Sequence, residues 1–183
     1  GRGPSSFNMF IGASGRKPLQ FQLSLPTPAC RNKILFNVEP AANGSSRCNL
    51  ALSVSKADID VLAFWQKIDS HVIAHTAKHS KEFLKREMTE DDVRAIYQPC
   101  IRVKDDYDNV IKVRFDTDPG ARCECKMFDV NEYKKRYSAL HHLQLSQGDE
   151  VTCIVQLGMV YFFNQKVGCT VDVSHLTRYA PPP

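Results

Sequence analysis

Residues 147–173 constrain the fold of this chain most strongly, because they read as consecutive β-strands separated by single glycines. The glycines are Gly148, Gly158 and Gly168, and the stretch also carries the aromatic run Tyr161–Phe163. It contains no set of residues typical of catalysis. A sheet that presents aromatic rings and a few basic side chains is better suited to holding a ligand than to transforming one. The stretch therefore favours a binding protein over an enzyme.

Alternation of apolar and polar residues predicts further strands on both sides of a central segment, because side chains of a strand point to opposite faces in turn. The predicted strands are Leu19–Leu25, Lys33–Glu39, Cys48–Ser55, Cys100–Lys104, Val110–Phe115 and Cys123–Phe128. The later segment Asn131–His142 is polar and charged, and it is compatible with a helix. The chain thus resumes a strand pattern after its centre.

The central segment has a different period. From Asp58 to about Lys85, apolar residues recur every three or four positions, which predicts a helix. Thr89 can cap a second, short helix that ends by Tyr97, because Pro99 disfavours helical backbone before it. We therefore predict an α+β protein, built on a small antiparallel sheet or barrel with a helical insertion at about 58–97.

Composition and length place these elements in one domain. The chain has 183 residues, of which 43% are hydrophobic and 24% charged, as in soluble globular proteins. We predict a flexible N-terminal arm at 1–18, a single domain at 19–179 and a tail at 180–183. No apolar run reaches the ~20 residues that a membrane helix needs, and the N-terminus does not read as a signal peptide.

The charge is unevenly distributed. The net charge is +4, and residues 1–57 hold seven Lys or Arg residues against one acid, Glu39. Such an asymmetry is compatible with a polyanionic partner, or with an ordinary solvated surface. The seven cysteines show no disulfide framework, and buried, reduced thiols in an intracellular compartment are the simplest expectation.

Motifs for catalysis or metal binding are weak. The chain has no phosphate-binding glycine loop and no nucleophile elbow. His71, His75 and His79 follow one helix at four-residue spacing, but no glutamate stands where a zinc protease motif needs one. Cys123 and Cys125 share a strand face without the spacing of a zinc knuckle. We expect no enzyme activity, no cofactor and no metal, although a metal at either group stays open.

Basic and aromatic side chains follow the strands in a pattern that nucleic-acid binding requires. Alternation places Arg102 with Lys104 on one face, and Lys112 with Arg114 on one face of the next strand. Cations of this kind attract phosphates, and exposed rings stack with bases. The alternative is an ordinary two-faced sheet with cations outside and rings inside. The candidate nucleic-acid-binding residues are Arg102, Lys104, Lys112, Arg114, Lys126, Tyr161, Phe163 and Lys166.

Four segments stand out by their order and spacing. They are Phe64–Asp69 with Ser80–Phe83, Val93–Pro99, Ile111–Phe115, and the glycine-punctuated strands from Gly148 through Gly158–Phe162 to Lys166–Thr170. Taken in this order, they resemble a family of proteins from nucleocytoplasmic large DNA viruses, which includes an African swine fever virus single-stranded-DNA-binding protein. The family tends to carry Trp in the late strand where this chain has Tyr161.

The resemblance implies an OB-like β-barrel and sequence-tolerant binding of single-stranded DNA, as in DNA replication. It leaves open whether DNA or RNA is preferred. It also implies an intracellular protein, in a host cytoplasm, virus factory or virion if the source is viral. The alternative is a structural or interaction subunit that forms homo-oligomers or binds protein partners without touching nucleic acid.

Overall fold

The computed structural model describes residues 5–8, 20–22, 31–40, 46–121 and 124–183. These residues form a sheet with three α-helices between its fifth and sixth strands. The elements are β1 Ser5–Asn8, β2 Gln20–Gln22, β3 Asn32–Lys33, β4 Glu39–Pro40, β5 Arg47–Val54, α1 Ile59–Lys78, α2 Ser80–Phe83, α3 Glu90–Ile96, β6 Tyr97–Gln98, β7 Ile101–Arg102, β8 Asn109–Asp116, β9 Lys126–Asn131, β10 Arg136–Ala139, β11 Glu150–Phe163 and β12 Lys166–Tyr179. The predicted α+β class and the helical insertion are confirmed.

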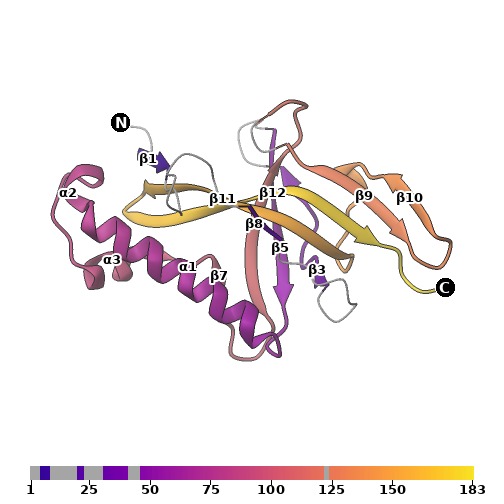
Figure 1. Cartoon of the computed structure of the whole chain (residues 1–183), viewed down its shortest axis with the longest axis horizontal. Coiled ribbons are helices and arrows are strands. Elements are labelled where there is room, and N and C mark those ends of the chain that lie inside the picture. The colour runs from indigo at the N-terminus through magenta and orange to yellow at the C-terminus, as the bar shows by residue number, and fades with distance from the viewer. Residues whose placement is uncertain (1–4, 9–19, 23–30, 41–45, 122–123) are drawn as a thin grey trace.

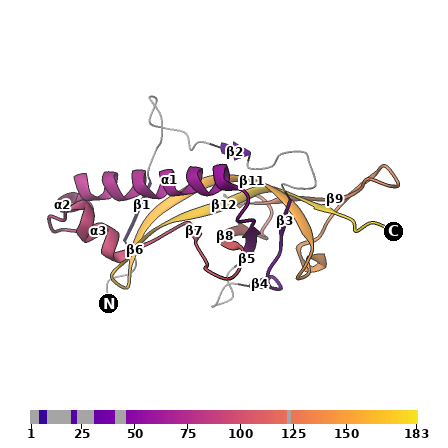
Figure 2. The same cartoon turned by 90° about the horizontal axis from the view of Figure 1, so that it is seen from below.

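The long antiparallel hairpin of β11 and β12 organises the sheet. The main strand order is β1-β11-β12-β8-β5-β4, and both hairpin strands have 14 residues. The helices α2 and α3 lie at one end of the long axis and the β9–β10 hairpin lies at the other (Figures 1 and 2). The glycine-punctuated stretch of the sequence is therefore the central strand pair of the fold. The prediction that Gly158 and Gly168 separate strands is wrong, because they lie inside β11 and β12, and the turn between the two strands is at Asn164–Gln165.

The sheet is mixed, so the prediction of an antiparallel sheet is wrong in part. Strand β12 pairs in parallel with β6, β8 and β9, and antiparallel with β11. Parallel neighbours require a connection that crosses back to the start of the strand. Apolar alternation has the same period in both arrangements, so the sequence pattern does not distinguish them.

One short segment contacts two distant strands. Asn32 and Lys33 pair with β11, while Ile34 forms a bridge with Leu52 of β5. The Leu35 amide then donates to the Ala51 carbonyl at 2.9 Å. Residues 32–35 therefore link β11 to β5, which are separated by two other strands in the main order.

The apolar side of α1 covers one face of the sheet and builds the core. Trp65 and Val72 are fully buried there, as the three- to four-residue spacing predicts. They join a single apolar cluster with strand residues such as Val113, Val160 and Val167. Each such buried side chain contributes ~1.5–3 kcal/mol, so this packing holds the helix on the sheet.

Capping differs between the predicted helix starts. Asp58 is the N-cap of α1, but its side chain accepts no capping hydrogen bond. Thr89 caps α3 as predicted, and it forms a reciprocal capping box with Asp92. The Asp92 carboxylate accepts from Thr89, which lowers the pKa of Asp92. The short α3 therefore begins at a strong local signal.

The sequence of residues 131–142 is compatible with a helix, but these residues do not form an α-helix. They form the turn and second strand of the β9–β10 hairpin, followed by a 3₁₀ turn at His142–Gln144. A four-residue loop closes the hairpin, and Lys135 takes a positive φ of 48° in it. Most side chains of β10 are exposed, so the strand shows little apolar alternation in the sequence.

The N-terminal segment is described only at two short strands. Ser5–Asn8 pairs with residues 159–162 of β11, and Gln20–Gln22 pairs with residues 154–156. The rest of residues 1–30 lies outside the described residues. The predicted domain boundaries at 18 and 179 therefore stay predictions.

Asp69 is a buried carboxyl that ties α1 to the chain beyond α3. Its Oδ1 accepts from the Tyr97 hydroxyl at 2.6 Å and from the Cys100 amide at 2.9 Å. Burial raises the pKa of Asp69 above its ordinary value of 3.8, although these hydrogen bonds lower it. Its contribution to folding is therefore fully present below pH 3.8, and it decreases as the pH rises through the folded-state pKa.

We expect Asp69→Ala to lower the free energy of unfolding by about 2 kcal/mol, because it leaves the buried Cys100 amide without its acceptor. Asp69→Asn keeps an acceptor oxygen and carries no charge, so it should be neutral or stabilising at pH 7. Urea denaturation of both variants measures the difference. Equal losses in the two variants would contradict the assigned role of the oxygen.

Candidate nucleic-acid interface

The sheet face opposite α1 gathers several of the predicted residues. Arg102 of β7 pairs with Val110 of β8, so Arg102, Lys112 and Arg114 project from the same face. Arg114 lies opposite Asn49 of β5. We call this surface the open face; it consists of Asn49, Gln98, Arg102, Lys112, Arg114, Tyr161, Thr170 and Asp172.

Arg114 is the most strongly anchored cation of the open face. Its Nε donates to Oδ1 of Asp172 at 2.5 Å, across the parallel pair of β8 and β12. The side chains are 18% and 4% exposed, respectively. Gly158 leaves room for this carboxylate, because a Cβ there would lie 2.6 Å from its Oδ2. Much of the charge of Arg114 is therefore already balanced inside the protein.

Tyr161 is held in place from two sides. Its hydroxyl donates to Oε1 of Gln98 at 2.9 Å, and its ring lies over Gly168. A Cβ at position 168 would approach the ring carbons to 2.5 Å, so any other residue would displace the ring. Burial raises the pKa of Tyr161, and the charges of Arg102 and Arg114 oppose that shift. Both arginines thus lie close enough to act on the ring.

A small hollow marks the centre of the open face. Its volume is about 170 Å³, and it is bounded by the side chains of Lys112, Arg114, Tyr161 and Asn49 together with β12. Lys112 is exposed, whereas Tyr161 is half-buried. The hollow therefore combines the fixed ring of Tyr161 with the cations Lys112 and Arg114. It can hold an anionic, partly aromatic ligand by stacking and by charge.

The tip of the β11–β12 hairpin carries two more of the predicted residues. Phe163 and Lys166 are direct partners there, and both are exposed. The two-residue loop Asn164–Gln165 has positive φ at both positions, as tight hairpin turns require. Phe163 shares a strand face with Tyr161, while Phe162 packs against the core, as the alternation predicts.

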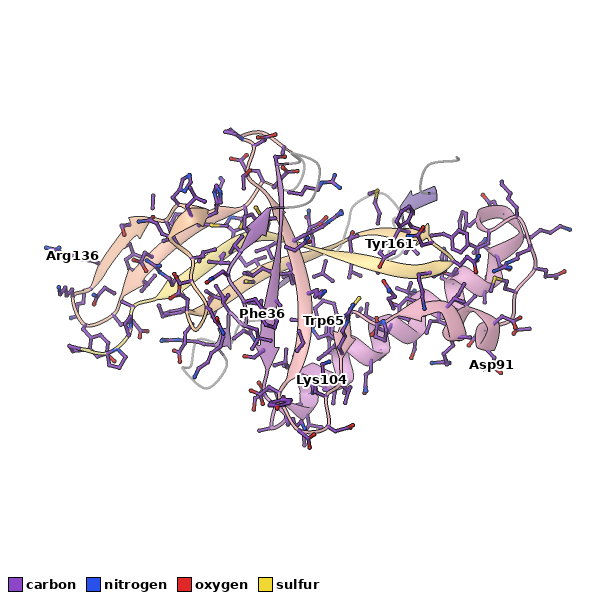
Figure 3. All side chains as sticks on the ribbon, turned by 180° about the vertical axis from the view of Figure 1, so that it is seen from behind. Phe36, Trp65, Asp91, Lys104, Arg136 and Tyr161 are labelled. Carbon is purple, nitrogen blue, oxygen red and sulfur yellow. The ribbon has the colours of Figure 1, made fainter. Side chains whose placement is uncertain are left out.

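The structure does not bring every predicted residue to the open face. Lys104 lies beyond the end of β7, in the loop that contains Asp105, Asp106 and Asp108. Figure 3 shows Lys104 well apart from Tyr161. Lys126 begins β9, which pairs with the C-terminal half of β12. The predicted set therefore divides into the open face, the hairpin tip and two outlying lysines.

Sequence reasoning missed Gln98 and Asn49. Gln98 reaches the open face because β6 pairs in parallel with β12, and Asn49 because β5 pairs with β8. Neither residue carries a motif. Only the strand pairing identifies them, and no pattern in the sequence could have done so.

The histidine and cysteine groups do not assemble a metal centre in the described part of the chain, where no three potential ligands come together. The ring centroids of His75 and His79 lie 4.6 Å apart with the rings tilted by 42°, and burial lowers the pKa of His75. Cys123 lies outside the described residues. Burial raises the pKa of Cys125 to about 12, so its thiol is protonated at neutral pH.

The cysteines that the structure describes are free thiols. They are Cys48, Cys100, Cys125, Cys153 and Cys169. Among the described helices, none combines the length and the hydropathy that a membrane span requires.

Two solved structures of bacteriophage proteins are similar to this fold. The first is gp2.5, a single-stranded DNA binding protein encoded by bacteriophage T7, with a TM-score of 0.56 at 10% identity. The match covers 91% of this chain and 89% of that chain. The second is a C-terminally truncated single-stranded DNA-binding protein from bacteriophage Enc34, with a TM-score of 0.51 at 9% identity, covering 90% and 86%.

These similarities define the class of fold. At such identities they show the fold alone, which is the α+β fold of the two phage proteins. By sequence, no family model and no curated protein matches the chain. The resemblance to proteins of large DNA viruses therefore stays a prediction.

Proposed function

We propose that this protein binds single-stranded DNA on the open face, without strong sequence preference. The observation that carries the proposal is a fixed ring, Tyr161, with the cations Lys112 and Arg114 around one hollow, and with Arg102 on the same sheet face. A strand crossing this face meets charge for its phosphates and a ring for a base. Phe163 and Lys166 at the hairpin tip extend the same surface.

The expected energetics agree with such a role. Stacking of one base on an aromatic ring contributes ~1–3 kcal/mol, and each phosphate contact adds a salt-dependent term. Arg114 is balanced by Asp172, so Lys112 and Arg102 are the cations with most to gain from a phosphate. The two structural neighbours support the proposal, since both are single-stranded DNA-binding proteins by their descriptions.

We also propose that the sheet closes into an OB-like barrel. The supporting observation is the segment of residues 32–35, which pairs with β11 on one side and β5 on the other. A ring of β11, β12, β8, β5 and this segment has the size of a small OB barrel. Residues 19–179 would then act as one domain.

In this proposal the protein acts inside the cell only by binding nucleic acid, and it needs no cofactor. The alternative function is that of a structural subunit, which binds protein partners or copies of itself. RNA should be tested as a second ligand. Base stacking and phosphate contacts are available to both polymers, so they do not by themselves discriminate against the 2′-hydroxyl of RNA.

We expect fluorescence anisotropy with a labelled oligo(dT) to show binding at low salt that weakens steadily as salt is added. About three phosphate contacts on a single strand predict a slope of log K against log salt of about −2. Oligo(dA) and mixed sequences should bind within about tenfold of oligo(dT), because stacking is tolerant of base identity.

Binding that is absent at low salt, or that does not respond to salt, would contradict the proposal. Size-exclusion chromatography without nucleic acid distinguishes DNA binding from the alternative function as a structural subunit. A stable oligomer or partner complex combined with no DNA binding would favour the structural subunit.

A further inference from the structure

A second surface with rings and cations lies on the β9–β10 hairpin and the adjoining part of β12. Strand pairing places Tyr137, Val130 and Tyr179 in one row across β10, β9 and β12, and Phe128 with Thr177 in the next row. We call this surface the β9–β10 face; it consists of Lys126, Phe128, Val130, Tyr137, Thr177 and Tyr179. All project to the same side because strand side chains alternate.

The rings of the β9–β10 face are exposed around a buried floor. Tyr137 is 77% exposed and Phe128 is 41% exposed, whereas Val130 between them is only 7% exposed. A hollow of about 580 Å³ lies over Val130, bounded by Tyr137, Tyr179 and Lys135. Arg31 covers one side of the Tyr179 ring at 3.6 Å, which fixes that ring as a wall. The floor and walls suit a flat, aromatic group.

The charge of the hairpin favours an anionic partner. Residues 126–137 contain four cations and two acids. Both acids are already balanced, since Asp129 pairs with Arg178 at 3.0 Å and Glu132 pairs with Arg31 at 2.8 Å. Within the described residues the four cations form no ion pair, and all are exposed; they are Lys126, Lys134, Lys135 and Arg136.

We propose that the β9–β10 face is a second contact surface for single-stranded DNA, with bases against Tyr137 and Phe128 and phosphates against Lys126 and Lys135. The proposal rests on the proposed function of the open face. Figure 3 shows Arg136 of the hairpin at one end of the molecule and Tyr161 of the open face well away from it, in the other half. A DNA strand must therefore be long to contact both, whereas a short strand occupies the open face alone.

The test compares labelled oligo(dT) of about 8 nucleotides, within the range of one OB-fold site, with oligo(dT) of about 30 nucleotides. The variant combines Phe128→Ala with Tyr137→Ala. We expect its affinity for the long strand to fall at least tenfold, and its affinity for the short strand to stay within about twofold of the unchanged protein. Tyr107→Ala is the matched control, because Tyr107 is also 77% exposed but lies in the acidic loop.

The outcomes separate this inference from the function on which it rests. If the variant binds both lengths like the unchanged protein, the second surface is refuted while the open face stands. If it loses affinity for both lengths equally, the assignment of short strands to the open face alone is refuted. If the unchanged protein binds neither length, the proposed function itself fails. The combination Lys126→Gln with Lys135→Gln gives a second readout, since it should lower the salt slope for the long strand alone by about 1.4.

Discussion

Arg114→Ala is expected to lower the free energy of unfolding by about 3–5 kcal/mol, the usual cost of removing one partner of a buried ion pair. Asp172 is almost fully buried, and its Oδ1 lies 2.5 Å from Nε of Arg114. Removing the guanidinium leaves a carboxylate in a site that water barely reaches. Equilibrium denaturation at neutral pH measures the loss.

The double substitution Arg114→Ala with Asp172→Asn is the control for this prediction. It removes the buried charge together with its partner and should recover most of the lost stability. The side-chain amide of Asn has the shape of the carboxylate, so it fits beside Gly158 in the same space. A loss below about 1 kcal/mol in the single variant would contradict the assignment of a buried pair.

This expectation also changes how the DNA interface is tested. A loss of binding in Arg114→Ala would report unfolding as much as a missing phosphate contact. Arg102 and Lys112 are exposed cations of the same face, and their substitution leaves the buried pair intact.

Arg102→Gln combined with Lys112→Gln is expected to weaken DNA binding of all sequences alike. Each phosphate contact to a single strand contributes a slope of about −0.7, so two contacts contribute about −1.4. Affinity should therefore fall about 65-fold at about 50 mM salt and about 14-fold at about 150 mM salt. Anisotropy titrations over a salt series measure both the loss and the change in slope.

Lys67→Gln combined with Lys81→Gln is the matched control. Both lysines are exposed on the helical side of the molecule, so the net charge changes equally while the open face is untouched. Equal losses in the two double variants would mean that net charge, and not the open face, drives binding. An unchanged salt slope in Arg102→Gln/Lys112→Gln would contradict direct phosphate contacts.

Local patterns predicted much of this fold because their causes are local. The capping box at Thr89 needs only a residue three positions away, and the helix of residues 59–78 follows from its own apolar stripe. Alternation likewise placed Lys112 and Arg114 on one face of their strand, since the strand period is a property of the backbone. The β9–β10 hairpin was missed because its second strand is exposed on both faces.

The candidate site was predicted less completely than the fold. Lys112, Arg114 and Tyr161 were selected from alternation, and the structure places them around one hollow. Lys104 was included by the same rule, but its strand ends at Arg102, so the rule no longer applied to it. Tyr137 and Phe128 were not selected, because neither stands in a regular basic and aromatic pattern.

The amino-acid sequence by itself determined most of the strands, the helical insertion and, within those strands, the side on which a residue projects. Only the tertiary structure decided which strand faces become neighbours in the sheet. Arg114 and Asp172 are 58 residues apart, and Tyr161 and Gln98 are 63 apart. Such contacts depend on strand order and on parallel pairing, which close long loops and leave no periodic trace in the sequence.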